Sequence, residues 1–94
     1  MSTLIGLSML TINPAIIRTP VADEGILLLE PTTGKYFELN DTSVLIYQCL
    51  ENEMDIQSIV ERLGNKFEID AQTAQTDVQD LITQFIQNNI CIET

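Results

Sequence analysis

The sequence predicts a single α+β domain in which a three-stranded antiparallel sheet is followed by three helices. β-Branched and aliphatic runs between turn signals fill the first half of the chain, and apolar residues at helical spacing fill the second half. The length of 94 residues suits one two-layer core. Such a chain can bury about 65% of its unfolded surface without metal or disulfide staples.

The strands of the first half are marked by β-branched residues and by turns. Residues 12–21 are expected to form an edge or irregular strand, because Pro14 and Pro20 interrupt the run. Asp23-Glu24-Gly25 is a turn signal, and the aliphatic run Ile26 to Leu29 follows it as the second strand.

A second turn predicts a hairpin and its register. Pro31-Thr32-Thr33-Gly34 is typical of a four-residue loop, and Lys35 to Leu39 alternates as the third strand. If Glu30 faces Lys35, one face is a core face that carries Ile26, Leu28, Phe37 and Leu39. The opposite face, unusually apolar for a solvated side, then carries Leu27, Leu29, Tyr36 and Glu38. A bulge at Gly34 would shift the pairing by one residue and exchange the faces.

Two helices are expected next, each with a capping residue. Asn40 or Asp41 caps a helix that runs to about Asn52, and Asp55 precedes a second helix. Helical spacing assigns the inward face of the first helix to Val44, Leu45, Tyr47 and Leu50. It assigns the inward face of the second to Ile56, Ile59, Val60, Leu63 and Phe67.

The third helix is the longest and begins after a cap at Asp70. Its apolar stripe consists of Ala71, Ala74, Val78, Leu81, Ile82, Phe85 and Ile86. Its water-facing residues are Thr76, Asp77, Asp80, Thr83 and Gln84. Residues 90–93 are expected to add a short terminal strand.

The composition excludes several classes of function. A formal charge of −10, from 14 acidic and 4 basic residues, argues against nucleic-acid binding, which depends on Lys and Arg. The second and third helices resemble a helix-turn-helix, but the third contains no Lys or Arg to bind DNA. The absence of histidine removes Ser-His and Cys-His catalysis and histidine-containing zinc sites. No metal-ligand spacing or phosphate loop is present, so no catalytic residue, metal or cofactor is expected.

The two cysteines and the N-terminal residues bear on the compartment. Cys49 and Cys91 lie in apolar stretches and are expected to be buried, reduced thiols. The run Leu4 to Leu10 lacks the features of a signal peptide and falls short of the roughly 20 apolar residues of a membrane span. The protein is therefore expected to be cytoplasmic, with no membrane partner. Residues 1–11 are interpreted as an extension that covers the apolar sheet face or mediates self-association.

An ordered series of motifs resembles the PqqD-like family. The series begins with Gly34-Lys35-Tyr36-Phe37-Glu38-Leu39-Asn40, continues through a helix, and reaches Asp55-Ile56-Gln57-Ser58-Ile59-Val60. Asp77-Val78, Leu81-Ile82, Phe85 and Asn89-Ile90 match the last helix of the family, so that the resemblance covers about residues 12–93. The family often has glycine near Asn52-Glu53 and near Asn89, where this chain has other polar residues.

The resemblance implies a function in peptide recognition. Members of the family are RiPP recognition elements, winged helix-turn-helix-like domains that bind the leader of a ribosomally made precursor peptide without catalysis. The chain is most similar to the stand-alone leader-binding protein of lasso peptide biosynthesis, which implies a leader peptidase and a cyclase as further partners. Two alternatives stay open: a PqqD-type chaperone that delivers a precursor to a radical enzyme, and an unrelated winged-helix interaction module.

The resemblance also places the leader as an added strand at the edge of the third strand, facing the third helix. The peptide-binding residues it implies are Lys35, Tyr36, Phe37, Glu38, Leu39, Asp77, Val78, Asp80, Leu81, Gln84 and Phe85. The strand would offer main-chain hydrogen bonds, the helix an apolar wall, and Asp77 and Asp80 a partner for a leader Lys or Arg. On periodicity alone, the apolar members of this set are core residues and the two aspartates are a solvated face.

Overall fold

The computed structural model describes residues 10–93 and has the α+β architecture that the sequence predicts. The strands are β1 (Leu10–Ile12), β2 (Ile17–Val21), β3 (Gly25–Glu30), β4 (Lys35–Leu39) and β5 (Cys91–Glu93). The helices are the 3-10 turn η2 (Ala22–Glu24) and α1 (Asp41–Glu51), α2 (Ile56–Phe67) and α3 (Ala71–Gln87). Of the apolar run Leu4 to Leu10, only Leu10 is among the described residues. The two roles expected for this run, covering the sheet face or self-association, therefore fall outside them.

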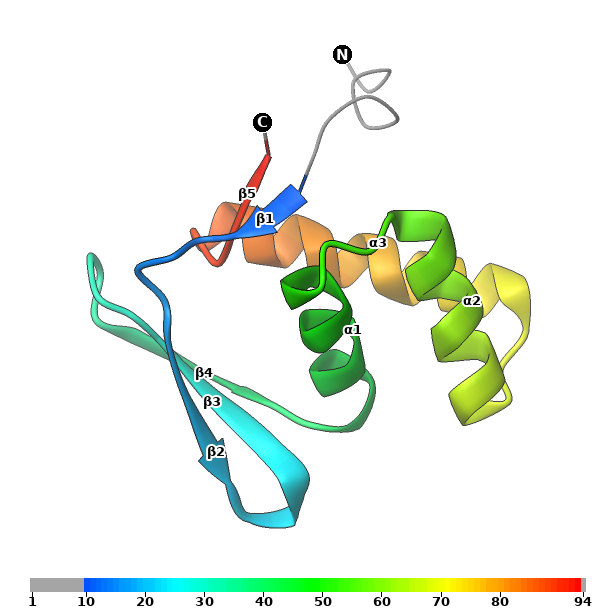
Figure 1. The fold of residues 1–94 in the computed structure, drawn as a ribbon, viewed down its shortest axis with the longest axis horizontal. Coiled ribbons are helices and arrows are strands. Elements are labelled where there is room, and N and C mark those ends of the chain that lie inside the picture. Colours follow the sequence, from blue (N-terminus) through cyan, green and yellow to red (C-terminus); the bar gives the residue numbers. More distant parts are fainter. Residues whose placement is uncertain (1–9, 94) are drawn as a thin grey trace.

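Two sheets flank the helices, as Figure 1 shows. Strands β2, β3 and β4 form a three-stranded antiparallel sheet in that order at one side of the helices. Strands β1 and β5 form a separate antiparallel pair in which Leu10 faces Glu93 and Ile12 faces Cys91. The terminal strand expected at residues 90–93 is therefore present, and its partner β1 overlaps the start of the first expected strand at Ile12.

The edge strand expected over residues 12–21 is present in part: β2 is an edge of the three-stranded sheet, but a turn divides the segment and separates β2 from β1. Asn13 Oδ1 accepts a hydrogen bond from the Ala15 N–H at 3.0 Å, and the Asn13 carbonyl accepts one from Ile16 N at 3.0 Å. Pro14, which has no N–H, sits inside this turn. The Asn-Pro pair thus ends β1 and starts a new strand that joins a different sheet.

The β3–β4 hairpin has the predicted register. Glu30 pairs with Lys35, and the pairing continues to Ile26 and Leu39 without a bulge. Gly34 has a φ of 75°, which glycine adopts without strain, and its N–H donates to the Glu30 carbonyl at 2.8 Å. Glu30 is buried as a residue, and its carboxylate accepts hydrogen bonds from Thr33 N at 2.9 Å and Thr32 N at 3.2 Å. These bonds, that from the Thr33 backbone above all, hold the pKa of Glu30 below its ordinary value.

The outer face of the sheet is apolar, as the register predicted. Ile17 pairs with Leu29, and Leu29 pairs with Tyr36, so that these side chains form a row across the three strands. Ile17 is 52% exposed and Tyr36 is 65% exposed, whereas Leu29 is half-buried.

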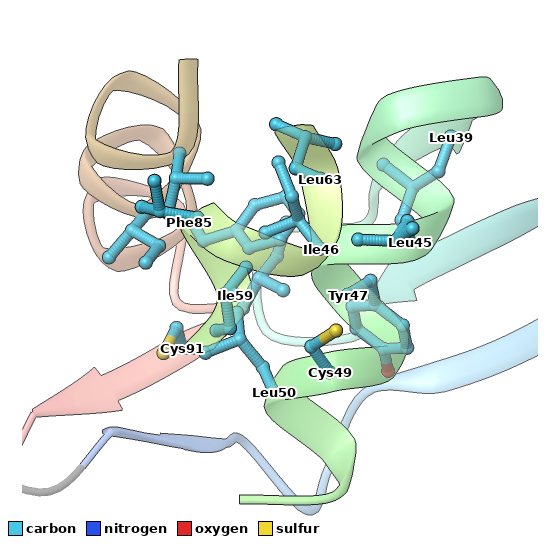
Figure 2. Packing of buried hydrophobic residues seen from close by; sticks show 14 of the residues in the cluster. Leu39, Leu45, Ile46, Tyr47, Cys49, Leu50, Ile59, Leu63, Phe85 and Cys91 are labelled. Atoms are coloured by element: carbon cyan, nitrogen blue, oxygen red, sulfur yellow. The ribbon is translucent and has the colours of Figure 1, made fainter. Parts of the chain in front are cut away.

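Helix α1 is the centre of the core, shown in Figure 2. Ile46 and Cys49 are buried in addition to the predicted Leu45, Tyr47 and Leu50. The reason is that α1 contacts β1, β3 and α2, so that side chains on several of its faces are covered. The predicted caps Asp55 and Asp70 are confirmed: their carboxylates accept hydrogen bonds from Ser58 N at 2.8 Å and Thr73 N at 2.7 Å.

The inward face of α3 is largely as predicted. Ala74, Val78, Ile82 and Phe85 are buried, and Leu81 and Ile86 are half-buried. Ala71 is exposed, contrary to the expectation, because it lies in the first turn of α3, before the helix reaches the core.

Candidate functional site

Strand β4 is an edge of the three-stranded sheet. The order β2-β3-β4 leaves one side of β4 without a neighbouring strand in the part of the chain that the structure describes. Alternate residues of such a strand turn their N–H and C=O groups outward, where an extended segment can pair with them. The β4 edge is therefore open to strand addition.

A groove lies between β4 and the C-terminal half of α3 and has a volume of about 390 Å³. We call it the β4 groove. Its lining residues are Tyr36, Phe37, Glu38, Leu39, Ser43, Leu81, Gln84, Phe85, Asn88 and Ile90. Strand β4 thus supplies one wall, and α3 supplies the opposite wall.

A second hollow, of about 290 Å³, adjoins the β4 groove along α3 and is called here the acidic end. It is lined by Thr42, Ser43, Ile46, Asp77, Asp80, Leu81 and Gln84. Ser43, Leu81 and Gln84 line both hollows, so the two are adjacent, and together they are called the depression. Asp77 and Asp80 are exposed carboxylates and give this end of the depression a negative charge at neutral pH.

The structure brings most of the expected site residues together. Nine of the eleven line the β4 groove or its acidic end: Tyr36, Phe37, Glu38, Leu39, Asp77, Asp80, Leu81, Gln84 and Phe85. Lys35 is exposed at the start of β4 and lines neither hollow.

Val78 must be corrected from a wall of the groove to a core residue. Its side chain is 0% exposed, because it lies on the side of α3 that faces the protein interior. Phe85 belongs to both environments: it is 3% exposed and packs edge-on against Tyr47 with a centroid distance of 6.2 Å. Leu81, which is half-buried, is therefore the apolar α3 side chain most available to a ligand.

Three lining residues of the β4 groove were missed by sequence reasoning: Ser43, Asn88 and Ile90. Asn88 could have been found, because Leu81, Gln84 and Asn88 follow one helical face at i, i+3 and i+7. Ser43 lies in the first turn of α1, where its hydroxyl accepts a hydrogen bond from Asn40 N at 2.9 Å. Helix α1 begins directly after β4, and nothing in its helical spacing marks Ser43 as part of the groove.

The described residues offer little for catalysis. Cys49 and Cys91 are buried free thiols, as expected, and burial raises the pKa of each, which disfavours the reactive thiolate. Residues 10–93 contain no cluster of three His, Cys, Asp or Glu side chains that could hold a metal ion. In the same part of the chain, no helix combines the length and apolar character needed to cross a bilayer.

Known proteins with the same fold bind peptides. The structure of TbiB1 in complex with the TbiA(beta) leader peptide is similar, with a TM-score of 0.79 and 23% identity over 86% of this chain and 93% of that one. Lasso peptide synthetase B1 complexed with the leader peptide is also similar. Its TM-score is 0.81 and its identity 25%, over 89% of this chain and 98% of that one. No curated protein matches the chain.

A family model places the chain more directly. The model of coenzyme PQQ synthesis protein D (PqqD) matches residues 25–90, from the start of β3 to the end of the turn after α3. The matched region contains β4, α3 and the whole β4 groove. Because it covers most of the sequence, the chain belongs to the PqqD family.

Proposed function

We propose that this protein is a non-catalytic recognition element that binds the leader of a ribosomally synthesised precursor peptide along β4. The observation that carries the proposal is the open edge of β4 beside a groove whose opposite wall is α3. Backbone pairing along β4 would supply affinity with little demand on sequence. Alternate side chains of the added strand would enter the groove and supply specificity.

The shape and charge of the depression favour a particular kind of leader. Leu81 offers an apolar surface for an aliphatic, aromatic or proline side chain of the leader. Asp77 and Asp80 lie one helical turn apart and suit a Lys or Arg placed nearby in the leader. The net charge of −10 would speed the approach of such a basic segment.

The biosynthetic setting that we propose is lasso peptide maturation. Two proteins that share this fold hold leader peptides, and one of them is a lasso peptide synthetase B1. In this role the protein would present the bound precursor to a leader peptidase and to a cyclase in the cytoplasm, where the precursor is translated. The alternative, delivery to a radical enzyme, has the support of the family name alone.

The proposal is tested with a fluorescent peptide copied from the leader of a candidate precursor peptide. Fluorescence anisotropy measures its affinity for the wild type, for Leu81→Glu and for the double variant Asp77→Asn/Asp80→Asn. We expect Leu81→Glu to weaken binding about tenfold or more, because it places a charge in the apolar wall. The double variant should lose about threefold to tenfold and show a weaker dependence on salt.

A matched control separates local contacts from net charge. Glu24→Gln/Glu61→Gln removes two exposed carboxylates that line neither the β4 groove nor its acidic end, so that both double variants carry −8. This control should keep the wild-type affinity within about twofold at 0.15 M salt, where distant charges are screened. Unchanged affinity in both groove variants, with unchanged melting temperatures, would remove the leader from this groove.

A further inference from the structure

A third hollow, of about 510 Å³, lies between α1 and α2, and we call it the α1–α2 hollow. It is lined by Leu45, Gln48, Cys49, Glu51, Asn52, Arg62 and Lys66. It shares no lining residue with the β4 groove or the acidic end, so ligands could occupy both regions at once.

The α1–α2 hollow is lined by two basic residues, although the protein as a whole is acidic. Arg62 and Lys66 are two of only four basic residues in the chain, and both are exposed. They stand at i and i+4 on α2, a spacing at which like charges repel and slightly destabilise a helix. Neither forms an ion pair with a carboxylate of residues 10–93, although the chain has 14 acidic residues.

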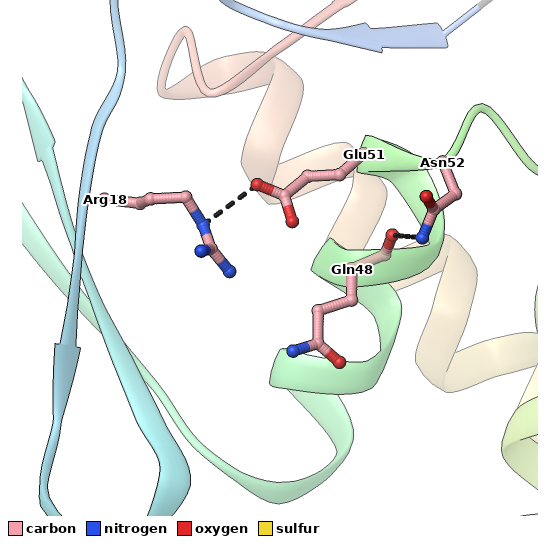
Figure 3. A network of polar contacts seen from close by, with 4 residues as sticks. All are labelled: Arg18, Gln48, Glu51 and Asn52. Carbon is pink, nitrogen blue, oxygen red and sulfur yellow. Dashed lines mark hydrogen bonds and ion pairs between the residues drawn. The ribbon is translucent and has the colours of Figure 1, made fainter.

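Glu51 is the one acidic residue that lines the α1–α2 hollow, and it forms an ion pair with Arg18, which does not line the hollow (Figure 3). Arg18 of β2 contacts the Glu51 carboxylate with Nε at 2.9 Å from Oε2. The Arg18 guanidinium also lies over the Tyr47 ring, 5.8 Å from its centroid. Because Arg18 balances Glu51, the remaining charge of the α1–α2 hollow is that of Arg62 and Lys66.

The rest of the lining suits a peptide better than a small phosphate. Leu45 and Cys49 are buried and form an apolar floor, while Gln48 and Asn52 are exposed amides at the rim. The Asn52 side-chain nitrogen donates to the Gln48 backbone carbonyl at 2.9 Å. The side-chain oxygen of Asn52 is then left to accept a hydrogen bond from a ligand. An apolar floor, amides and two flexible cations match a segment that has carboxylates next to an apolar side chain.

We propose that the α1–α2 hollow is a second docking site, which takes an acidic segment of a protein partner. Arg62 and Lys66 would pair with its carboxylates, and an adjacent aliphatic side chain would rest on Leu45 and Cys49. The protein would then bind a basic segment at the acidic end of the β4 groove and an acidic one at the α1–α2 hollow. This inference stands apart from leader binding, because different residues carry it.

The test uses the tetrapeptide ELEE, acetylated and amidated, with the neutral peptide QLQQ and sodium phosphate as separate probes. Each is titrated into the full ¹⁵N-labelled chain at low salt, and amide chemical shifts are followed by NMR. We expect ELEE to shift the amides of Gln48, Asn52, Arg62 and Lys66 with millimolar affinity, and QLQQ to shift none of them. The double variant Arg62→Gln/Lys66→Gln should bind ELEE at least about threefold more weakly, as two exposed ion pairs are lost.

The control for net charge is Gln72→Glu/Gln79→Glu on the exposed surface of α3. Both double variants carry −12, because one loses two positive charges and the other gains two negative ones. The control should keep most of the ELEE response. The inference is overturned if ELEE causes no shifts at the hollow, if QLQQ acts equally, or if Arg62→Gln/Lys66→Gln binds ELEE like the control. If phosphate shifts these amides and ELEE cannot displace the bound phosphate, the hollow is a small-anion site and not a peptide site.

Discussion

Six residues other than glycine have a positive φ in the described part of the chain, and two of them bear on the family pattern. Glu53, between α1 and α2, has a φ of 59°, and Asn89, after α3, has a φ of 62°. The PqqD-like pattern often has glycine near these two positions, and glycine adopts this left-handed conformation without strain. The strain differs between the two, because asparagine tolerates this region much better than glutamate does.

The substitution Glu53→Gly should therefore stabilise the protein by about 0.5 kcal/mol or slightly more. The left-handed conformation costs an ordinary residue about 1–2 kcal/mol, and the greater freedom of glycine in the unfolded chain offsets part of the gain. Urea denaturation at pH 7 measures the free energy of unfolding. Glu53→Ala, which removes the same carboxylate and keeps the strain, should give no such gain. Equal stabilisation by both variants would attribute the effect to charge instead of to backbone strain.

Residue patterns predicted correctly which face of a helix points toward the protein interior, but not how deeply each side chain is buried. The spacing of Leu81 and Phe85 marks the side of α3 that meets the protein, and the structure agrees. The same spacing includes Val78, which is completely buried and cannot touch a ligand. The burial depth of a side chain depends on which elements cover its helix face. Helix α3 packs against α2 and β5 and meets α1 through the Phe85–Tyr47 ring contact, and the spacing within α3 does not show this.

At the scale of elements, local chemistry determined what could be predicted. The β3–β4 register followed from the four-residue loop between the strands, and the whole hairpin lies within 15 residues of sequence, Gly25 to Leu39. Strand β1 could not be found in this way, because it has three residues and its partner β5 lies at the other end of the chain. The strand edge that faces a helix at the β4 groove was implied by the family resemblance, and which of its residues bind a leader stays a prediction.

Three carboxylates that hold turns and helix starts should make the fold sensitive to acid. Hydrogen bonds from the backbone of Thr33, Ser58 and Thr73 lower the pKa values of Glu30, Asp55 and Asp70. The folded protein therefore binds protons less readily than the unfolded chain at these sites. Their stabilisation is present above the ordinary pKa values of 4.5 and 3.8, and is lost as the pH falls through the lowered values.

The triple variant Glu30→Gln/Asp55→Asn/Asp70→Asn isolates this effect, because it keeps hydrogen-bond acceptors and removes the titration. We expect it to be less stable than the wild type at pH 7 and to approach the wild type as the pH falls below about 4. Urea titrations between pH 7 and 3 provide the comparison. A difference in stability that does not change over this range would show that the three carboxylates act through geometry alone.

At the scale of the whole molecule, charge is abundant and unevenly placed. The described chain extends over 35 × 33 × 19 Å, so at 10 mM salt, where screening acts over about 30 Å, its acidic groups repel one another across the molecule. Against this background, Asp77 and Asp80 border the acidic end, while Arg62 and Lys66 border the α1–α2 hollow. The two proposed docking regions therefore have opposite local signs.

Salt should consequently stabilise this protein. Raising sodium chloride from 10 mM to 1 M should increase the melting temperature by about 5 °C, because it screens the repulsion that accompanies a charge of −10. Circular dichroism at 222 nm follows the transition. Glu24→Gln/Glu61→Gln, at −8, should gain less from salt than the wild type. A melting temperature that falls with salt would mean that attractive ion pairs outweigh the repulsion.

The β1–β5 pair has a consequence for how the domain can be combined with other proteins. Leu10 and Glu93 face each other in register, and Asn13 N and Nδ2 donate to the carbonyls of Ile90 and Asn89 at 2.9 and 2.8 Å. Directly paired residues in antiparallel strands have Cα atoms only about 5 Å apart. Because the two ends of the described domain lie side by side, residues 10–93 could be inserted into a surface loop of a larger enzyme. The ends of that loop would need to separate by only about 5 Å, and neither junction would need a long linker.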